Sequence, residues 1–125
     1  MIHGVGTDIV RIVRMVDALA RHGDRFATRI LAPAERAEFV ASPEPARFLA
    51  KRFAAKEAFG KALGTGVARP ATLHALAVRH DPLGRPLFCY SDELSAYLEE
   101  RAMAAHLSLS DEADYVVAFA LIEIR

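Results

Sequence analysis

The sequence of 125 residues contains a single cysteine, Cys89, and no long apolar run. One cysteine excludes an internal disulfide framework and a metal site built from cysteines alone, and it is consistent with a reducing, cytoplasmic compartment. Because no stretch of about 18 apolar residues is present, the sequence predicts no membrane span. The first residues, MIHGVGTDIV, lack the basic segment and long apolar run of a signal peptide, so none is predicted.

The sequence also lacks an excess of charge, because 16 Lys and Arg balance 16 Asp and Glu. An acidic partner would therefore have to meet a local basic patch, since the whole molecule has no strong field. A neutral chain without interleaved aromatic and basic residues does not fit a nucleic-acid-binding protein. The content of 53% hydrophobic and 26% charged residues predicts a folded globular protein, with one domain over residues 1–125.

Changes in hydrophobic periodicity predict where helices and strands alternate. Strands are expected over residues 2–10, 74–80, 86–91, 106–110 and 115–124, and helices over residues 10–22, 33–40, 45–63 and 91–104. The order β-α-α-α-β-β-α-β-β predicts an α+β fold, with helices packed on one side of a largely antiparallel sheet.

Two glycines near the start share a strand face with a carboxylate. Gly4, Gly6 and Asp8 alternate along the first strand, so they point to the same side. Glycine inside a strand often marks the close approach of another backbone or of a ligand. This bare strip predicts a helix lying close to the sheet beside Asp8. An alternative is that Asp8 caps the helix that follows, since Asp is a favoured capping residue.

The stretch FAAKEAFGK, residues 53–61, places a glutamate among cations. On a helix, Phe53, Glu57 and Lys61 line one face at i, i+4 and i+8. One interpretation is a surface ion pair between Glu57 and Lys61, worth about 0.2–0.5 kcal/mol. Over residues 51–61, however, this one acid stands against four cations, Lys51, Arg52, Lys56 and Lys61. Such an excess suits a phosphate ligand with a divalent cation such as Mg²⁺, for which Asp8 and Glu57 could supply the carboxylates.

Both stretches resemble the signatures of the 4′-phosphopantetheinyl transferase family. The first signature is a Gly-x-Asp core, here Gly6-Thr7-Asp8 in GVGTDIV. The second lies in RFAAKEAFGKALGTG and comprises Phe53, Lys56, Glu57, Ala58 and Lys61. The separation of the two motifs, the short chain and the HLSLS segment resemble the bacterial acyl-carrier-protein synthase group within that family.

The resemblance implies an activity, a cofactor and an assembly. The activity is transfer of the phosphopantetheine arm of coenzyme A to a serine of apo-acyl carrier protein, in support of fatty acid biosynthesis. The other product is adenosine 3′,5′-bisphosphate. Asp8 and Glu57 are implied to bind Mg²⁺, with Glu57 and Lys61 acting in catalysis. The family also implies a homotrimer with active sites between protomers.

The expected contacts to coenzyme A are Arg52, Lys61, Gly64, Pro86 and His106. The alternatives are a plain hairpin turn at Gly84-Arg85-Pro86 and a strand-edge histidine without a role. Two acceptors remain open for the serine proton, namely a water on the metal and Glu57 acting through one water. Asp111 stands where some relatives carry a second histidine, so it inherits no role.

A basic stripe lies on the first helix. Arg14, Arg21 and Arg25 recur at i, i+7 and i+11, although Gly23 interrupts the pattern. A solvated charged face is the alternative interpretation. Because acyl carrier proteins are acidic and helical, and the family docks them on its first helix, the resemblance implies that these arginines and Phe26 contact the carrier protein.

Two other functions compete with the transferase. One is a non-catalytic binding module for coenzyme A or carrier protein, and the other is a different Mg²⁺-dependent phosphate enzyme on the same scaffold. Only the transferase predicts a gain of mass on the apo-carrier protein.

Overall fold

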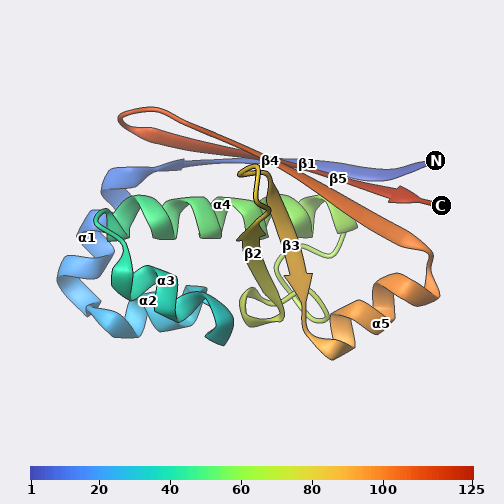
Figure 1. Ribbon diagram of the computed structural model, residues 1–125, viewed down its shortest axis with the longest axis horizontal. Helices are drawn as coiled ribbons and strands as arrows, with labels where there is room; N and C mark the ends of the chain where they lie inside the picture. The colour runs from blue at the N-terminus through green and yellow to red at the C-terminus, as the bar shows by residue number, and fades with distance from the viewer.

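The computed structural model describes all residues from 1 to 125. The strands are β1 (Ile2–Arg11), β2 (Leu76–His80), β3 (Pro86–Tyr90), β4 (Met103–Asp111) and β5 (Tyr115–Ile124). The α-helices are α1 (Ile12–His22), α2 (Asp24–Ile30), α3 (Arg36–Ala41), α4 (Pro45–Leu63) and α5 (Asp92–Glu100). Two short 3₁₀ helices, η1 (Pro33–Glu35) and η2 (Leu73–Ala75), complete the chain (Figure 1). No helix is both long enough and apolar enough to cross a membrane.

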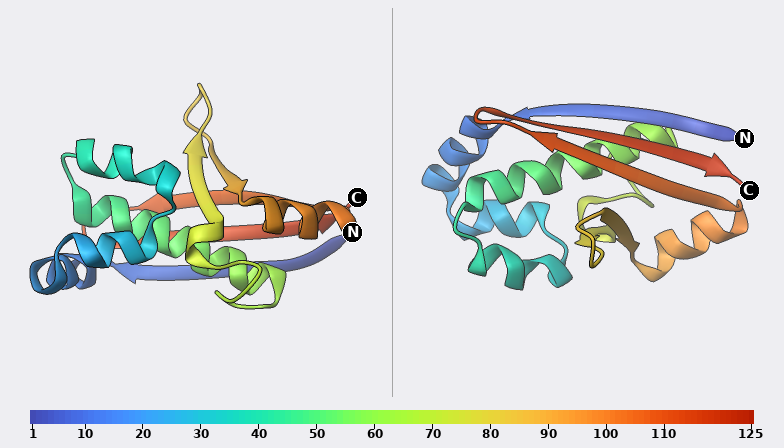
Figure 2. Two further views of the ribbon diagram at one scale, coloured as in Figure 1. Left: turned by 90° about the horizontal axis from the view of Figure 1, so that it is seen from below. Right: turned by 45° about the horizontal axis from the view of Figure 1, so that its top comes forward.

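The α+β class and antiparallel pairing are confirmed, but the strands form two sheets instead of one. A three-stranded antiparallel sheet has the order β1-β5-β4, and β2 pairs only with β3. The helix α4 lies between the larger sheet and the β2–β3 ribbon, with α1, α2 and α3 at one end and α5 at the other (Figures 1 and 2).

The expected end of the first helix at His22 is confirmed, because Gly23 adopts a φ of 59° and a separate helix, α2, starts at Asp24. One expected element boundary is wrong for a local backbone reason. The last helix ends at Glu100 and not at Ala104, because the strand β4 begins at Met103 and pairs with β5. The expected start of the 33–40 helix at Pro33 is confirmed, although its first turn is the 3₁₀ helix η1.

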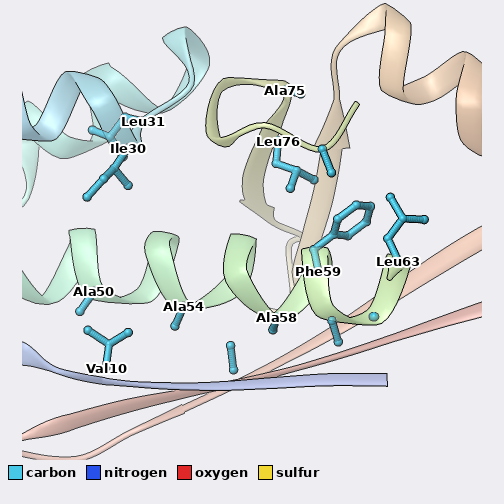
Figure 3. Packing of buried hydrophobic residues seen from close by; sticks show 14 of the residues in the cluster. Val10, Ile30, Leu31, Ala50, Ala54, Ala58, Phe59, Leu63, Ala75 and Leu76 are labelled. Carbon is cyan, nitrogen blue, oxygen red and sulfur yellow. The ribbon is translucent and has the colours of Figure 1, made fainter. Parts of the chain in front are cut away.

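The expected close approach of a helix to the glycine strip is confirmed. A Cβ on Gly4 would collide with the carbonyl oxygen of Ala62, and a Cβ on Gly6 would collide with that of Ala58. The α4 face toward the sheet is correspondingly small, with Ala50, Ala54 and Ala58 fully buried above β1 (Figure 3). Glycine opposite alanine therefore allows the helix backbone to lie close to the strand.

Replacing Gly6 with Ala should force α4 away from β1. The added Cβ would also lie 2.8 Å from the Ala62 nitrogen, which is backbone and cannot rotate aside. Overpacking of this kind typically costs about 1–3 kcal/mol, so we expect Gly6→Ala to lower the unfolding free energy by about 3 kcal/mol in a denaturant titration.

The control is Glu99→Ala, exposed on α5 and remote from the β1–α4 contact, which is expected to cost less than about 1 kcal/mol. Equal losses in the two variants would contradict the close-packing explanation.

Candidate active site

The contact between β1 and α4 brings Asp8 beneath Lys61. The Lys61 ammonium donates to the Thr7 carbonyl oxygen at 2.8 Å and lies 3.3 Å from Asp8 Oδ1. The Asp8 side chain is 18% exposed, whereas that of Lys61 is 52% exposed. The capping interpretation of Asp8 is wrong, because the residue before α1 is Arg11 and no side chain caps this helix. Asp8 is thus paired with a half-exposed cation.

Glu57 lies one helical turn before Lys61 and close enough to Asp8 for the two carboxylates to repel each other. Burial raises the pKa of the Glu57 carboxyl, the charge of Asp8 raises it further, and Lys61 opposes both. Glu57 forms no ion pair with Lys61, so the interpretation as a surface i,i+4 pair is wrong. Two carboxylates that repel one another provide a place where a further cation is favourable.

The oxygen donors of Asp8 and Glu57 fit Mg²⁺ shared with a phosphate ligand. The chain has no group of three or more His, Cys, Asp and Glu side chains that could enclose a metal ion. Zinc in a structural site needs four protein ligands. Mg²⁺ instead commonly takes one or two carboxylates and completes its shell with waters and substrate phosphates. Asp8 and Glu57 are the two carboxylates that would hold it.

The end of α4 adds to this preference for cations. Gly64 ends the helix with a φ of 95°, and the N–H groups of Gly64 and Gly66 both donate to the Gly60 carbonyl oxygen at 3.0 Å. A helix C-terminus carries a partial negative charge. A phosphate near Gly64 therefore could not use the helix dipole, and would depend on Lys61 and a metal ion for its counter-charge.

Arg52 does not lie beside Asp8 and Glu57, contrary to the expectation that it would accompany Lys61. Arg52 lies five positions before Glu57, which places the two side chains about 140° apart around the helix. The Arg52 side chain is 3% exposed, with Nε 3.2 Å from Glu35 Oε2 and Nη2 3.4 Å from Glu38 Oε2. A count of cations along a helix does not reveal which way each one points.

Pro86 and His106 lie on the β4 side of the molecule, away from β1. The tip of the β2–β3 ribbon, which precedes Pro86, projects beyond β4 on the side opposite β1 (Figure 2). His106 is exposed on β4, with Nε2 3.5 Å from Glu123 Oε1. Within one chain, then, the expected nucleotide contacts do not meet Asp8 and Glu57.

Sequence reasoning missed a charged pocket on this β4 side. Its lining includes Arg47, Lys51, Arg52 and His80 together with the acids Glu38 and Glu44. Asp111 accepts a hydrogen bond from Arg47 at 2.6 Å and lies 3.7 Å from the Lys51 ammonium, so it ties the β4–β5 turn to α4. The i,i+4 spacing of Arg47 and Lys51 was the available signal, although their acidic partner is distant in sequence.

The basic stripe is divided between two helices. Arg14 and Arg21 are exposed on α1, whereas Arg25 is exposed on α2 beside the half-buried Phe26. None of these three arginines forms an ion pair with an acid of the chain. Unpaired cations on an exposed surface are available to an acidic partner.

Comparison with known structures shows the same fold in proteins of one kind. The crystal structure of holo-[acyl-carrier-protein] synthase from Neisseria meningitidis matches with a TM-score of 0.95 at 47% identity, covering 98% of this chain and 99% of that one. The Bacillus anthracis holo-(acyl-carrier-protein) synthase, in complex with CoA (3′,5′-ADP), matches with a TM-score of 0.84 at 33% identity, covering 100% and 99%.

Comparison of sequences agrees with the structural match. The holo-[acyl-carrier-protein] synthase of Aromatoleum aromaticum is 70% identical over 125 residues, covering 100% of both chains. The family model for the 4′-phosphopantetheinyl transferase superfamily matches residues 4–120. The chain therefore belongs to the 4′-phosphopantetheinyl transferase superfamily.

Proposed function

We propose that this chain transfers the 4′-phosphopantetheine arm of coenzyme A to a serine of apo-acyl carrier protein. The observation that carries the proposal is that Asp8, Glu57 and Lys61 lie close together where β1 meets α4, in a chain 70% identical to a holo-[acyl-carrier-protein] synthase. The coproduct is adenosine 3′,5′-bisphosphate. The enzyme acts in the cytoplasm and supports fatty acid biosynthesis.

The transfer is a substitution at phosphorus. The serine oxygen forms a bond to the β-phosphorus of coenzyme A, the bond from that phosphorus to the bridging oxygen breaks, and the serine proton passes to an acceptor. Catalysis of this kind depends mainly on positioning and charge stabilisation. Asp8 and Glu57 are the residues that would hold Mg²⁺, and the ion would supply positive charge to neutralise the pyrophosphate. Lys61, half exposed and on a flexible stem, turns from Asp8 to the phosphates.

We also propose a homotrimer in which neighbouring protomers share each active site. The face of the larger sheet away from α4 is apolar and exposed, with exposed fractions of 53% at Val5, 60% at Ile9 and 40% at Phe119. A neighbour packed on this face would remove apolar area from water. Sharing also explains why Pro86 and His106 lie far from Asp8 within one chain, since they would complete the site of another protomer.

The test of the proposed function is mass spectrometry of apo-acyl carrier protein after incubation with the enzyme, coenzyme A and Mg²⁺. The expected result is a mass gain equal to one phosphopantetheine group on the acceptor serine. Tight binding of coenzyme A or of carrier protein without any mass gain, under every divalent metal tried, would favour a binding module.

Glu57→Gln should remove a metal ligand while preserving side-chain shape. Losing one of two carboxylates should lower kcat/KM at least about a hundredfold, equivalent to nearly 3 kcal/mol of transition-state stabilisation. It should also shift the Mg²⁺ concentration required for half-maximal rate upward. Steady-state rates across a Mg²⁺ titration measure both effects. Glu99→Gln on α5 is the control, and unaltered Mg²⁺ dependence in Glu57→Gln would refute the assignment.

Arg21→Glu should weaken acceptor docking more than donor binding. Reversing an exposed charge slows association with an acidic partner, and this effect shrinks as salt screens it. We expect KM for carrier protein to rise about tenfold at low salt and KM for coenzyme A to stay within about twofold. Arg101→Glu is the control, because Arg101 directly follows α5, the helix at the opposite end of the molecule from α1 (Figure 1). Arg14→Glu should behave like Arg21→Glu, and equal changes in both KM values would argue against docking here.

Light scattering coupled to size exclusion should give a mass three times the 13.7 kDa of one chain. Phe119→Asp should shift the protein toward monomer and abolish transfer, because burying an unpaired carboxylate in the interface is unfavourable. Ser95→Asp, on α5 outside the sheet, should leave the mass unchanged. A wild-type protein that remains monomeric while fully active would rule out shared sites.

A further inference from the structure

Three charged side chains are buried together on the side of α4 that faces away from the larger sheet. Their exposed fractions are 1% for Glu35, 2% for Arg52 and 0% for Lys56. The Lys56 ammonium donates to Glu35 Oε1 at 2.6 Å, to the Ile30 carbonyl oxygen at 2.7 Å and to the Leu73 carbonyl oxygen at 2.9 Å. All three of its hydrogens are thereby used, and each points to a different segment.

The Glu35 carboxylate collects the complementary contacts. Its Oε1 accepts from the Ala32 N–H at 2.9 Å as well as from Lys56, and its Oε2 accepts from the Val78 N–H at 2.9 Å. The Arg52 Nε also lies 3.2 Å from Oε2. One carboxylate thus joins α4, the turn before η1 and the strand β2, and two cations compensate its charge.

The segments held by Lys56 lead directly to the surface proposed to dock the acceptor. Ile30 is the last residue of α2, the helix that carries Arg25 and Phe26. Leu73 begins η2, and His74 of that turn contacts the Thr28 carbonyl oxygen of α2 through Nε2 at 2.8 Å. Lys56 therefore ties the C-terminal end of α2, both directly and through η2, to the helix that carries Glu57.

Stability alone does not account for such an arrangement. Desolvation cancels much of the attraction in a buried ion pair, and well-packed apolar residues of similar volume are often as stabilising. A buried ammonium that donates all three of its hydrogens, as Lys56 does, has an effect that apolar packing achieves less well, because it fixes distance and direction between segments.

We propose that Lys56 is a positioning residue, which sets the acceptor-docking helix α2 relative to the neighbouring Glu57. The proposal rests on the proposed function. Lys56 and Glu57 are consecutive on α4, so their side chains point about 100° apart around the helix. Lys56 is buried against the segments that support α2, whereas Glu57 is partly exposed close to Asp8. The helix backbone between them carries the spacing from the docking surface to the metal ligand.

The test is Lys56→Met, which keeps the length of the side chain and removes its hydrogen bonds. Glu35 retains Arg52, Ala32 and Val78, so no buried charge is left without a partner. We expect KM for carrier protein to rise about tenfold while KM for coenzyme A stays within about twofold, as misplacement of one reactant predicts. Amide hydrogen exchange should quicken at residues 30–32 and 73–75 but not in β1.

Two further variants distinguish positioning from simple loss of stability. Lys56→Gln, whose amide still donates two hydrogen bonds, should give intermediate values, and it replaces Lys56→Met if the latter does not fold. Leu94→Ala on α5 creates a cavity at a fully buried position remote from α2, so it should lower stability and leave the ratio of the two KM values unchanged.

Unchanged exchange at residues 30–32, or equal changes in both KM values in the Lys56 variants, would overturn the inference. A failure of the proposed function is recognised separately, because the wild-type enzyme would then transfer nothing to carrier protein, and the basis of this inference would fail with it.

Discussion

The close contact between the glycines of β1 and the alanines of α4 is the constraint on which the candidate site depends. Wherever a side chain separated these two elements, the helix would sit farther from the sheet, and Lys61 could not reach both Asp8 and the Thr7 carbonyl oxygen. The contact has little energy of its own, because glycine buries almost no side chain. Its effect is geometric, since it brings Asp8 of β1 close to Glu57 and Lys61 of α4, which are distant in sequence.

The helix α4 separates two kinds of charge chemistry. On the side toward β1, Glu57 and Lys61 are partly open to solvent, and their partners can be exchanged for a metal ion or a phosphate. On the side away from the larger sheet, Lys56 and Arg52 are buried and form ion pairs with Glu35. Residues adjacent in sequence therefore serve unlike purposes, because a step of one residue turns the side chain by about 100°.

How far the sequence predicts this structure differs from feature to feature. The bare face of Gly4 and Gly6 predicts the approach of a helix, and alternation predicts which side of β1 carries Asp8. The cation excess on α4 is visible, but the inward direction of Arg52 depends on Glu35, an acid in a short turn with no distinctive pattern. The two sheets were also hidden, because β2 and β3 have ordinary strand composition and their separation arises from the helix packed between them and the larger sheet.

The pairing of β1 with β5 has a consequence for how the site comes into being. Asp8 lies opposite Ala118, so the strand that carries the first carboxylate has its only sheet partner near the other end of the sequence. During synthesis α4 can form its helix early, but β1 must remain without a sheet partner until β5 has left the ribosome. Because contacts between residues far apart in sequence form slowly, the final positioning of Asp8 should be one of the last events in folding.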